Sequence, residues 1–161
     1  MLVSNTGIFF PLTVRNNQMQ DIYIDANVWN FVFDNNIDLL FELPENEFRL
    51  LQTREAEFEN NAIPEDKIEL KAFIKKEIKR CGIQTIFIFG FNDNAIPENE
   101  RRFGGLEENS VWITSEEKKF RNQQKQELGK LRKSKLFKNE ADIAIASKSF
   151  ESIVLLSLIH I

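Results

Sequence analysis

The chain has 161 residues, of which 42% are hydrophobic and 29% charged, and its formal net charge is −4. This length and composition are typical of one globular domain with a core, and no apolar run is long enough to cross a bilayer. The single cysteine, Cys81, excludes an internal disulfide and indicates a reducing cytoplasm, where we expect its side chain in the core. The start of the chain has neither a basic n-region nor a clear cleavage site, so we expect no signal peptide.

The hydrophobic pattern predicts a polar extension, residues 1–20, followed by alternating strands and helices. The apolar run from Ile22 to Asp25 predicts a buried strand that leads into a loop and a helix. The remaining pattern predicts helices over 34–43, 54–62, 65–81, 116–133 and 140–150, strands over 47–53, 83–91 and 152–159, and a long irregular region over 92–114. Ser115 and Asn139 resemble the start signals of the last two helices. This order predicts an α/β domain over 21–161, with helices on both faces of a central, mainly parallel sheet.

The charge is unevenly distributed along this domain. Residues 115–138 carry nine Lys or Arg and three acids, a formal charge of +6, whereas the rest of the chain carries −10. A basic segment on an acidic body is a candidate surface for contacting phosphates.

Two aspartates stand where a parallel α/β sheet binds its ligands, beyond the carboxyl ends of the strands. Asp25 ends the first strand, and the alternative interpretation is a turn or capping aspartate. Asp142 stands in the first turn of the last helix, and the alternative is a favourable interaction with the helix dipole. Its neighbours in sequence, Ile143 to Ala146, are apolar, so we expect the Asp142 carboxylate to be buried or half-buried.

A third acid comes from the stretch that follows the second strand. Glu55, Glu57 and Glu59 are candidates, and a solvated face is the alternative for each. Three carboxylates in one pocket repel each other unless a hard divalent cation such as Mg²⁺ lies among them. Such a cation activates water and offsets charge on an attacked phosphodiester. The only histidine is His160, and no GxGxxG or P-loop pattern is present, so histidine-ligated zinc, Ser/His triads and nucleotide-binding loops are not expected.

The same residues resemble a known family. IYIDANVW, EFRLLQTREAEFENNAIP and KNEADIAIAS are similar, in this order, to the first three acidic motifs of PIN domains, and the resemblance covers roughly residues 21–157. PIN domains are Mg²⁺- or Mn²⁺-dependent nucleases that act mostly on RNA. The resemblance implies that Asp25, Asp142 and one glutamate, with Glu59 favoured over Glu55 and Glu57, bind the metal, and that Asn27 orients Asp25. It further implies that a basic helix holds the RNA, with Lys130, Arg132, Lys133 and Lys135 as the contacts.

The resemblance also has implications for partners. Many bacterial PIN domains are toxins of toxin–antitoxin pairs, so an antitoxin protein and a homodimer are candidate partners. The segment SIVLLS resembles the strand before a fourth acid, but no acid follows Glu151. Residues 156–161 match the translation of a transposon-end sequence used as a sequencing adapter, and we expect the native chain to continue differently after Leu155; the alternative is a chance match or a genuine C-terminus. The alternative function is a catalytically inactive PIN-like module for RNA or protein binding.

Overall fold

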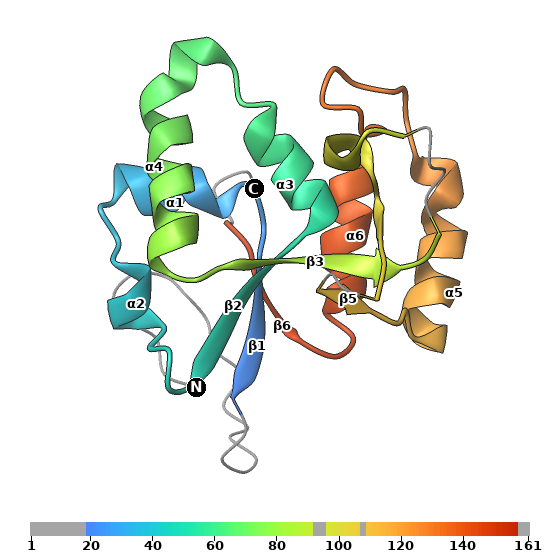
Figure 1. The fold of residues 1–161 in the computed structure, drawn as a ribbon, viewed down its shortest axis with the longest axis horizontal. Helices are drawn as coiled ribbons and strands as arrows, with labels where there is room; N and C mark the ends of the chain where they lie inside the picture. Colours follow the sequence, from blue (N-terminus) through green and yellow to red (C-terminus); the bar gives the residue numbers. More distant parts are fainter. Residues whose placement is uncertain (1–18, 92–95, 107–108, 158–161) are drawn as a thin grey trace.

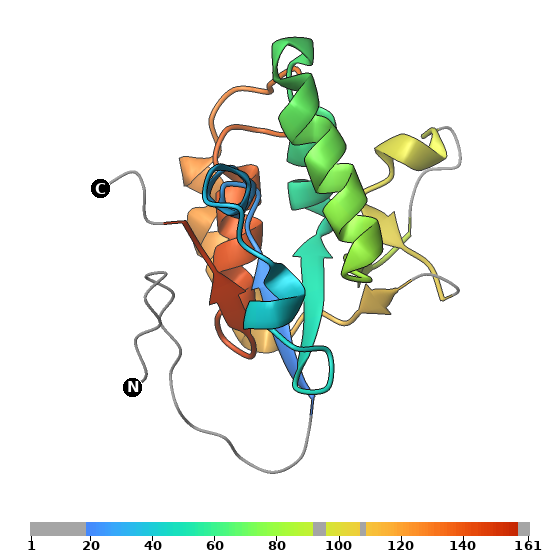
Figure 2. The same cartoon turned by 90° about the vertical axis from the view of Figure 1, so that its left-hand side faces the viewer.

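A computed structural model of the chain describes residues 19–91, 96–106 and 109–157. It has the predicted fold class, an α/β fold with a central parallel sheet and helices on both faces (Figures 1 and 2). The strands follow the order β4-β3-β2-β1-β6, and β5 pairs with β3 as well. The strands are β1 (Gln20–Ile24), β2 (Phe48–Thr53), β3 (Gln84–Phe89), β4 (Phe103–Gly104), β5 (Ser110–Val111) and β6 (Ile153–Leu155).

The two faces of the sheet are covered by different helices. Ile22 and Ile24 of β1 belong to the larger core cluster, which includes Trp29 of α1 and Ile74 of α4. Tyr23, which points to the opposite face because side chains alternate along a strand, packs instead with Ile145 of α6. The helices are α1 (Val28–Asp34), α2 (Leu39–Glu42), α3 (Arg54–Asn61), α4 (Ile68–Arg80), α5 (Ser115–Gln123) and α6 (Glu140–Lys148), with 3₁₀ turns η1 (Glu65–Lys67), η2 (Glu98–Glu100) and η3 (Gln124–Glu127).

The helices before β3 largely follow the prediction. The expected helices over 54–62 and 65–81 are α3 and the pair η1 and α4, and Cys81 is buried at the end of α4. The expected helix over 34–43 is wrong at its start. Helix α1 ends at Asp34, and α2 begins at Leu39. Between them, Asn36 has a φ of 50°, a left-handed conformation that asparagine tolerates and that interrupts a helix.

The basic segment departs most from the prediction. The charged helix expected over 116–133 ends at Gln123 in α5, followed by η3, and residues 128–139 form a loop that we call the basic loop. A β-bridge between Leu131 and Phe137 closes this loop on itself. A Cβ at Gly129 would lie 2.8 Å from Cβ of Lys138, so the close return of the chain requires glycine there. Four of the expected RNA contacts therefore stand on a loop rather than on a helix.

The starts of the last two helices also differ in detail. Helix α5 is capped by Thr114, whose hydroxyl accepts from the Glu117 N–H while the Glu117 carboxylate accepts from the Thr114 N–H. Ser115 is therefore the first helical residue and not the cap. Asn139 precedes α6 as expected, but it has a φ of 68° and donates to the carbonyl of Glu127 instead of capping the helix.

The last strand ends earlier than predicted. Strand β6 covers three residues of the strand expected over 152–159, and residues 158–161 lie outside the described part, as do residues 1–18 of the expected extension. The region 92–114 contains η2 and the short strands β4 and β5, where we had expected irregular chain. Across the described residues, none of the helices combines the length and the apolar character that a membrane span requires.

Candidate functional site

Asp25 lies directly beyond the carboxyl end of β1. Its backbone N–H donates to the Leu155 carbonyl of β6 at 3.1 Å, which extends the sheet pairing by one residue, and its own carbonyl accepts from the Val28 N–H at the start of α1. The residue is only 6% exposed. The Asn27 side chain and the backbone N–H groups of Asn27 and Ala26 hydrogen-bond to its carboxylate and lower its pKa, but burial outweighs them and the pKa of Asp25 is raised.

Both interpretations of Asp25 therefore describe part of its surroundings. The carboxylate does organise the turn before α1, as a turn aspartate would. The expected orienting contact from Asn27 is also present, since its side chain hydrogen-bonds to Asp25. The raised pKa of Asp25 comes first from burial and only in a smaller part from the charge of Asp142.

Glu59 lies in the last turns of α3 and is half-buried. Burial raises the pKa of Glu59, and the charges of Asp142 and Asp25 raise it further, while the Arg132 guanidinium lowers it. The other two candidates also have cationic partners: Glu55 lies 3.4 Å from Arg121, and Glu57 lies 2.6 Å from Arg54. The pKa of Glu59 shows that it shares an electrostatic environment with both aspartates.

Asp142 stands in the first turn of α6, where the helix dipole favours a carboxylate. Contrary to expectation, its side chain is exposed, because the apolar residues that follow it turn toward the sheet on other faces of the helix. Its charge nevertheless raises the pKa of both Asp25 and Glu59.

A small apolar cluster explains why these elements meet. Phe58 of α3, Leu136 of the basic loop and Ala141 of α6 pack together, and each is adjacent in sequence, or nearly so, to a charged residue of the site. Figure 1 shows α3 and the start of α6 side by side above the carboxyl ends of β1 and β2. The packing of Phe58 on Ala141 therefore brings Glu59 and Asp142 to the same end of the sheet as Asp25.

These acids suit a hard divalent cation in kind and in charge, since Mg²⁺ and Mn²⁺ prefer carboxylate oxygens. Within the described residues, however, no three His, Cys, Asp or Glu side chains are close enough together to form a metal cluster as they stand. Glu59 is instead 3.5 Å from the Arg132 guanidinium. Binding of a cation would require the three acids to move closer and Glu59 to leave Arg132.

The expected phosphate contacts are exposed, and two of them already have acidic partners. Arg132 pairs with Glu59, and Lys135 pairs with Glu100. Lys130 and Lys133 are exposed, and no ion pair involves either of them in the part of the chain that the structure describes. Arg102, which the sequence did not single out, pairs with Glu140 and donates to the Lys135 carbonyl, so it fastens the basic loop to α6.

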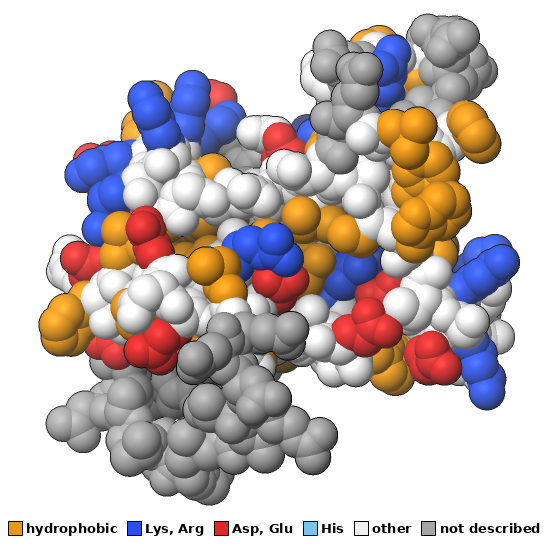
Figure 3. All heavy atoms as spheres, turned by 60° about the horizontal axis from the view of Figure 1, so that its bottom comes forward, with side chains coloured by type: hydrophobic (Ala, Val, Ile, Leu, Met, Phe, Trp, Pro, Cys, Tyr) orange, Lys and Arg blue, Asp and Glu red, His pale blue; other side chains and the backbone are white. Residues whose placement is uncertain are grey.

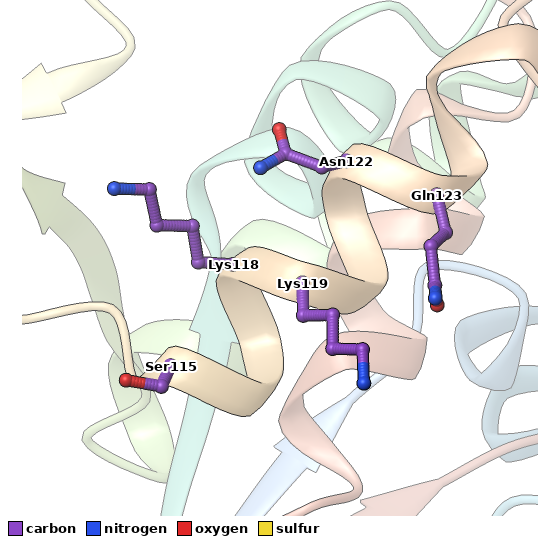
Figure 4. Close-up of a pocket in the computed structure, with 5 residues that line it drawn as sticks. All are labelled: Ser115, Lys118, Lys119, Asn122 and Gln123. Atoms are coloured by element: carbon purple, nitrogen blue, oxygen red, sulfur yellow. The ribbon is translucent and has the colours of Figure 1, made fainter.

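Two hollows of different character lie on the surface. The first, about 530 Å³, is an open face of α5 lined by Ser115, Lys118, Lys119, Asn122 and Gln123 (Figure 4). It has two lysines and no acid, so it is a further candidate surface for phosphates. The second, about 200 Å³, is lined by residues of α1, α3 and α4 and includes Asn27 and Glu59 of the candidate site.

The surface also has an apolar patch that sequence analysis did not identify. Figure 3 shows hydrophobic side chains gathered on the face formed by β3, β4 and β5. Phe91, Leu106 and Trp112 are 93%, 89% and 76% exposed, and Trp112 stacks on Phe89 with ring centroids 4.3 Å apart. Residues 85–89 of β3 are themselves only part-buried.

Comparisons with protein-family models, with curated proteins and with solved structures return no match for this chain.

Proposed function

We propose that this protein is a metal-dependent endoribonuclease of PIN-like type. The observation that carries the proposal is the group of acids at the carboxyl ends of β1 and β2, where Asp25 and Glu59 have raised pKa values and are affected by Asp142. Groups with pKa values raised by burial and like charges are characteristic of functional sites. The resemblance to PIN domains assigns the same three residues to the metal.

The residues have distinct roles in this proposal. Asp25, Glu59 and Asp142 would hold Mg²⁺ or Mn²⁺, which supplies an activated water and offsets charge on the scissile phosphate. Asn27 keeps the Asp25 carboxylate in place through its side-chain hydrogen bond. Lys130 and Lys133 are exposed cations that can contact the RNA backbone, and Arg132 can join them once it leaves Glu59. An antitoxin protein and a homodimer stay predictions from the resemblance.

The test is cleavage of single-stranded RNA in Mn²⁺ by the wild-type chain and by Asp25→Asn. We expect the substitution to reduce cleavage at least about 100-fold, the usual scale for loss of a group that positions the reacting centre. Asp66→Asn is the control, since Asp66 is exposed in η1 and takes part in no ion pair within the described residues. Equal cleavage by the Asp25→Asn variant would contradict the assignment.

The pairing of Glu59 with Arg132 favours a second candidate, an RNA-binding module without catalysis. In that case Glu59 would stay paired with Arg132 when Mn²⁺ is added, and the three acids would bind no cation. RNA binding in EDTA, together with no cleavage and no rise in melting temperature in Mn²⁺, would select this candidate, because a cation that binds only the folded state must stabilise it.

A further inference from the structure

The cavity of about 200 Å³ lies between α1, the end of α3 and α4, beside the candidate metal site. Its walls include the apolar side chains of Trp29, Ile63 and Pro64. Drug-sized ligands usually occupy about 300–1,000 Å³, so this cavity has room for a single ring system and not for a whole nucleotide. Apolar walls with a few convergent polar groups are the usual form of a small-molecule site.

The polar groups of this cavity are mostly amides. Asn30 is exposed on α1, Asn60 is 7% exposed on α3, and Lys67 is exposed at the end of η1. An asparagine amide has both a donor and an acceptor, as have the edges of the nucleobases, and a lysine donates to base or phosphate oxygens. The set therefore suits a neutral heterocycle better than an anion or a hydrocarbon.

Asn60 adds an independent observation. Its NH₂ group donates to Gln52 at 3.2 Å, and Gln52 donates in turn to Thr85 at 2.9 Å. Its carbonyl oxygen Oδ1 is buried, and no donor to it exists among the described residues. A buried acceptor without a donor lowers stability, and a ligand that supplies an N–H group can recover this loss. In the present conformation Oδ1 is closed off from solvent, so the ligand has to displace the side chains that cover it.

We propose that this cavity binds one nucleobase of the RNA, the base that flanks the cleaved phosphodiester. The base would stack against the apolar wall and donate an N–H group to Oδ1 of Asn60. Glu59 lines the cavity and is also a candidate metal ligand, so a base held here lies next to the reacting phosphate. This inference rests on the proposed function for its biological meaning, but the binding itself requires no metal.

The test uses the four ribonucleosides as probes, with the whole chain in EDTA, so that neither phosphate nor metal contributes. The sequence has two tryptophans, and labelling both with 5-fluorotryptophan gives two ¹⁹F resonances. Trp29 lines the cavity, whereas Trp112 is not among the lining residues and serves as the internal control. We expect at least one nucleoside at millimolar concentration to shift the Trp29 resonance and leave that of Trp112 unchanged. No shift with any nucleoside, or an equal shift with ribose alone, would overturn the proposal.

Two variants locate the site. Asn60→Leu should weaken nucleoside binding about tenfold, the effect of one lost hydrogen bond. Because Asn60 is buried and its loss could impair folding, Asn30→Phe provides a second route: it fills the cavity from an exposed position on α1 and should abolish the Trp29 shift. Asn46→Phe is its control, an exposed asparagine in the turn before β2 that does not line the cavity, and should bind normally. Normal binding by Asn30→Phe would overturn the location.

Failure of this inference and failure of the nuclease proposal give different results. Nucleoside binding without Mn²⁺-dependent stabilisation or cleavage would leave the base site and remove the metal site. Cleavage that depends on Asp25, combined with no nucleoside binding, would leave the nuclease and remove the base site.

Discussion

Two buried carboxylates of this protein, those of Glu117 and Asp25, differ in whether a cation neutralises their charge. Glu117 of α5 is 2% exposed, and its charge is matched by the buried ammonium of Lys148 of α6 at 2.9 Å. Asp25 is 6% exposed, and in the described part of the chain it has hydrogen-bond donors and no ion pair, while the charge of Asp142 acts on it unfavourably. A carboxylate paired with a cation holds two helices together, whereas one left beside other acids lowers stability. The difference separates a structural acid from a candidate functional acid.

The largest expected effect tests the structural side of this comparison. Lys148→Met leaves the Glu117 charge buried without its partner, and we expect the free energy of unfolding to fall by about 3–5 kcal/mol in urea titrations. The double variant Lys148→Met/Glu117→Leu removes both charges and should recover most of that loss, except for the contribution of the Glu117 hydrogen bond to the Thr114 N–H. A loss of less than about 1 kcal/mol in the single variant would put this pair among exposed surface pairs and remove the contrast.

This pair also shows what sequence could and could not supply. Strands β1, β2, β3 and β6 and the amphipathic helix α4 were predictable, because the apolar run or the apolar spacing that indicates each of them lies within one element. Glu117 and Lys148 are far apart along the chain, and nothing local indicates that α5 packs on α6 so that they meet. The predicted length of the helix over 116–133 was wrong for a related reason. A run of charged residues is compatible with a helix and also with a loop such as the basic loop.

The candidate site was predictable to a similar degree. Strand ends give the position of Asp25, because β1 has a strong pattern and the carboxyl ends of parallel strands share one edge. The resemblance favoured Glu59 among the three glutamates, and this choice stays a prediction; the packing of Phe58 on Ala141, which brings α3 and α6 together, could not be read from the sequence. The prediction that the Asp142 carboxylate is buried or half-buried was wrong. Its apolar neighbours in sequence point to other faces of the helix and do not cover its side chain.

The second prediction concerns the candidate functional acids, Asp25 and Glu59, and the pH dependence of the free energy of unfolding measured in EDTA. Burial and like charges raise the folded-state pKa values of Asp25 and Glu59 above their unfolded values, so the folded state takes up protons first as the pH falls. Their stabilising contribution is therefore complete below about pH 4, the ordinary carboxyl range, and is lost as the pH rises through the raised values. Asp25→Asn should increase the free energy of unfolding at neutral pH and flatten this pH dependence.

Urea titrations across this pH range measure the effect, with Asp66→Asn as the exposed control. A destabilised Asp25→Asn variant with an unchanged pH profile would mean that the hydrogen bonds from Ala26 and Asn27 dominate, and that Asp25 is a turn residue.

The smallest expected effect concerns Arg132, whose guanidinium forms an ion pair with Glu59. Its ion pair spans 3.5 Å between side chains that are 46% and 26% exposed, so Arg132→Gln should change the free energy of unfolding by less than about 1 kcal/mol. The same substitution frees Glu59 for a cation, and the midpoint of Mn²⁺-dependent thermal stabilisation should fall by up to about fivefold. Lys133→Gln is the matched control, because it removes the same charge from the basic loop at an exposed position. If both variants shift the midpoint equally, the effect is the general field of the loop. If Arg132→Gln does not lower the midpoint, release of Glu59 does not help the cation to bind, and Glu59 belongs with Glu117 among the structural acids.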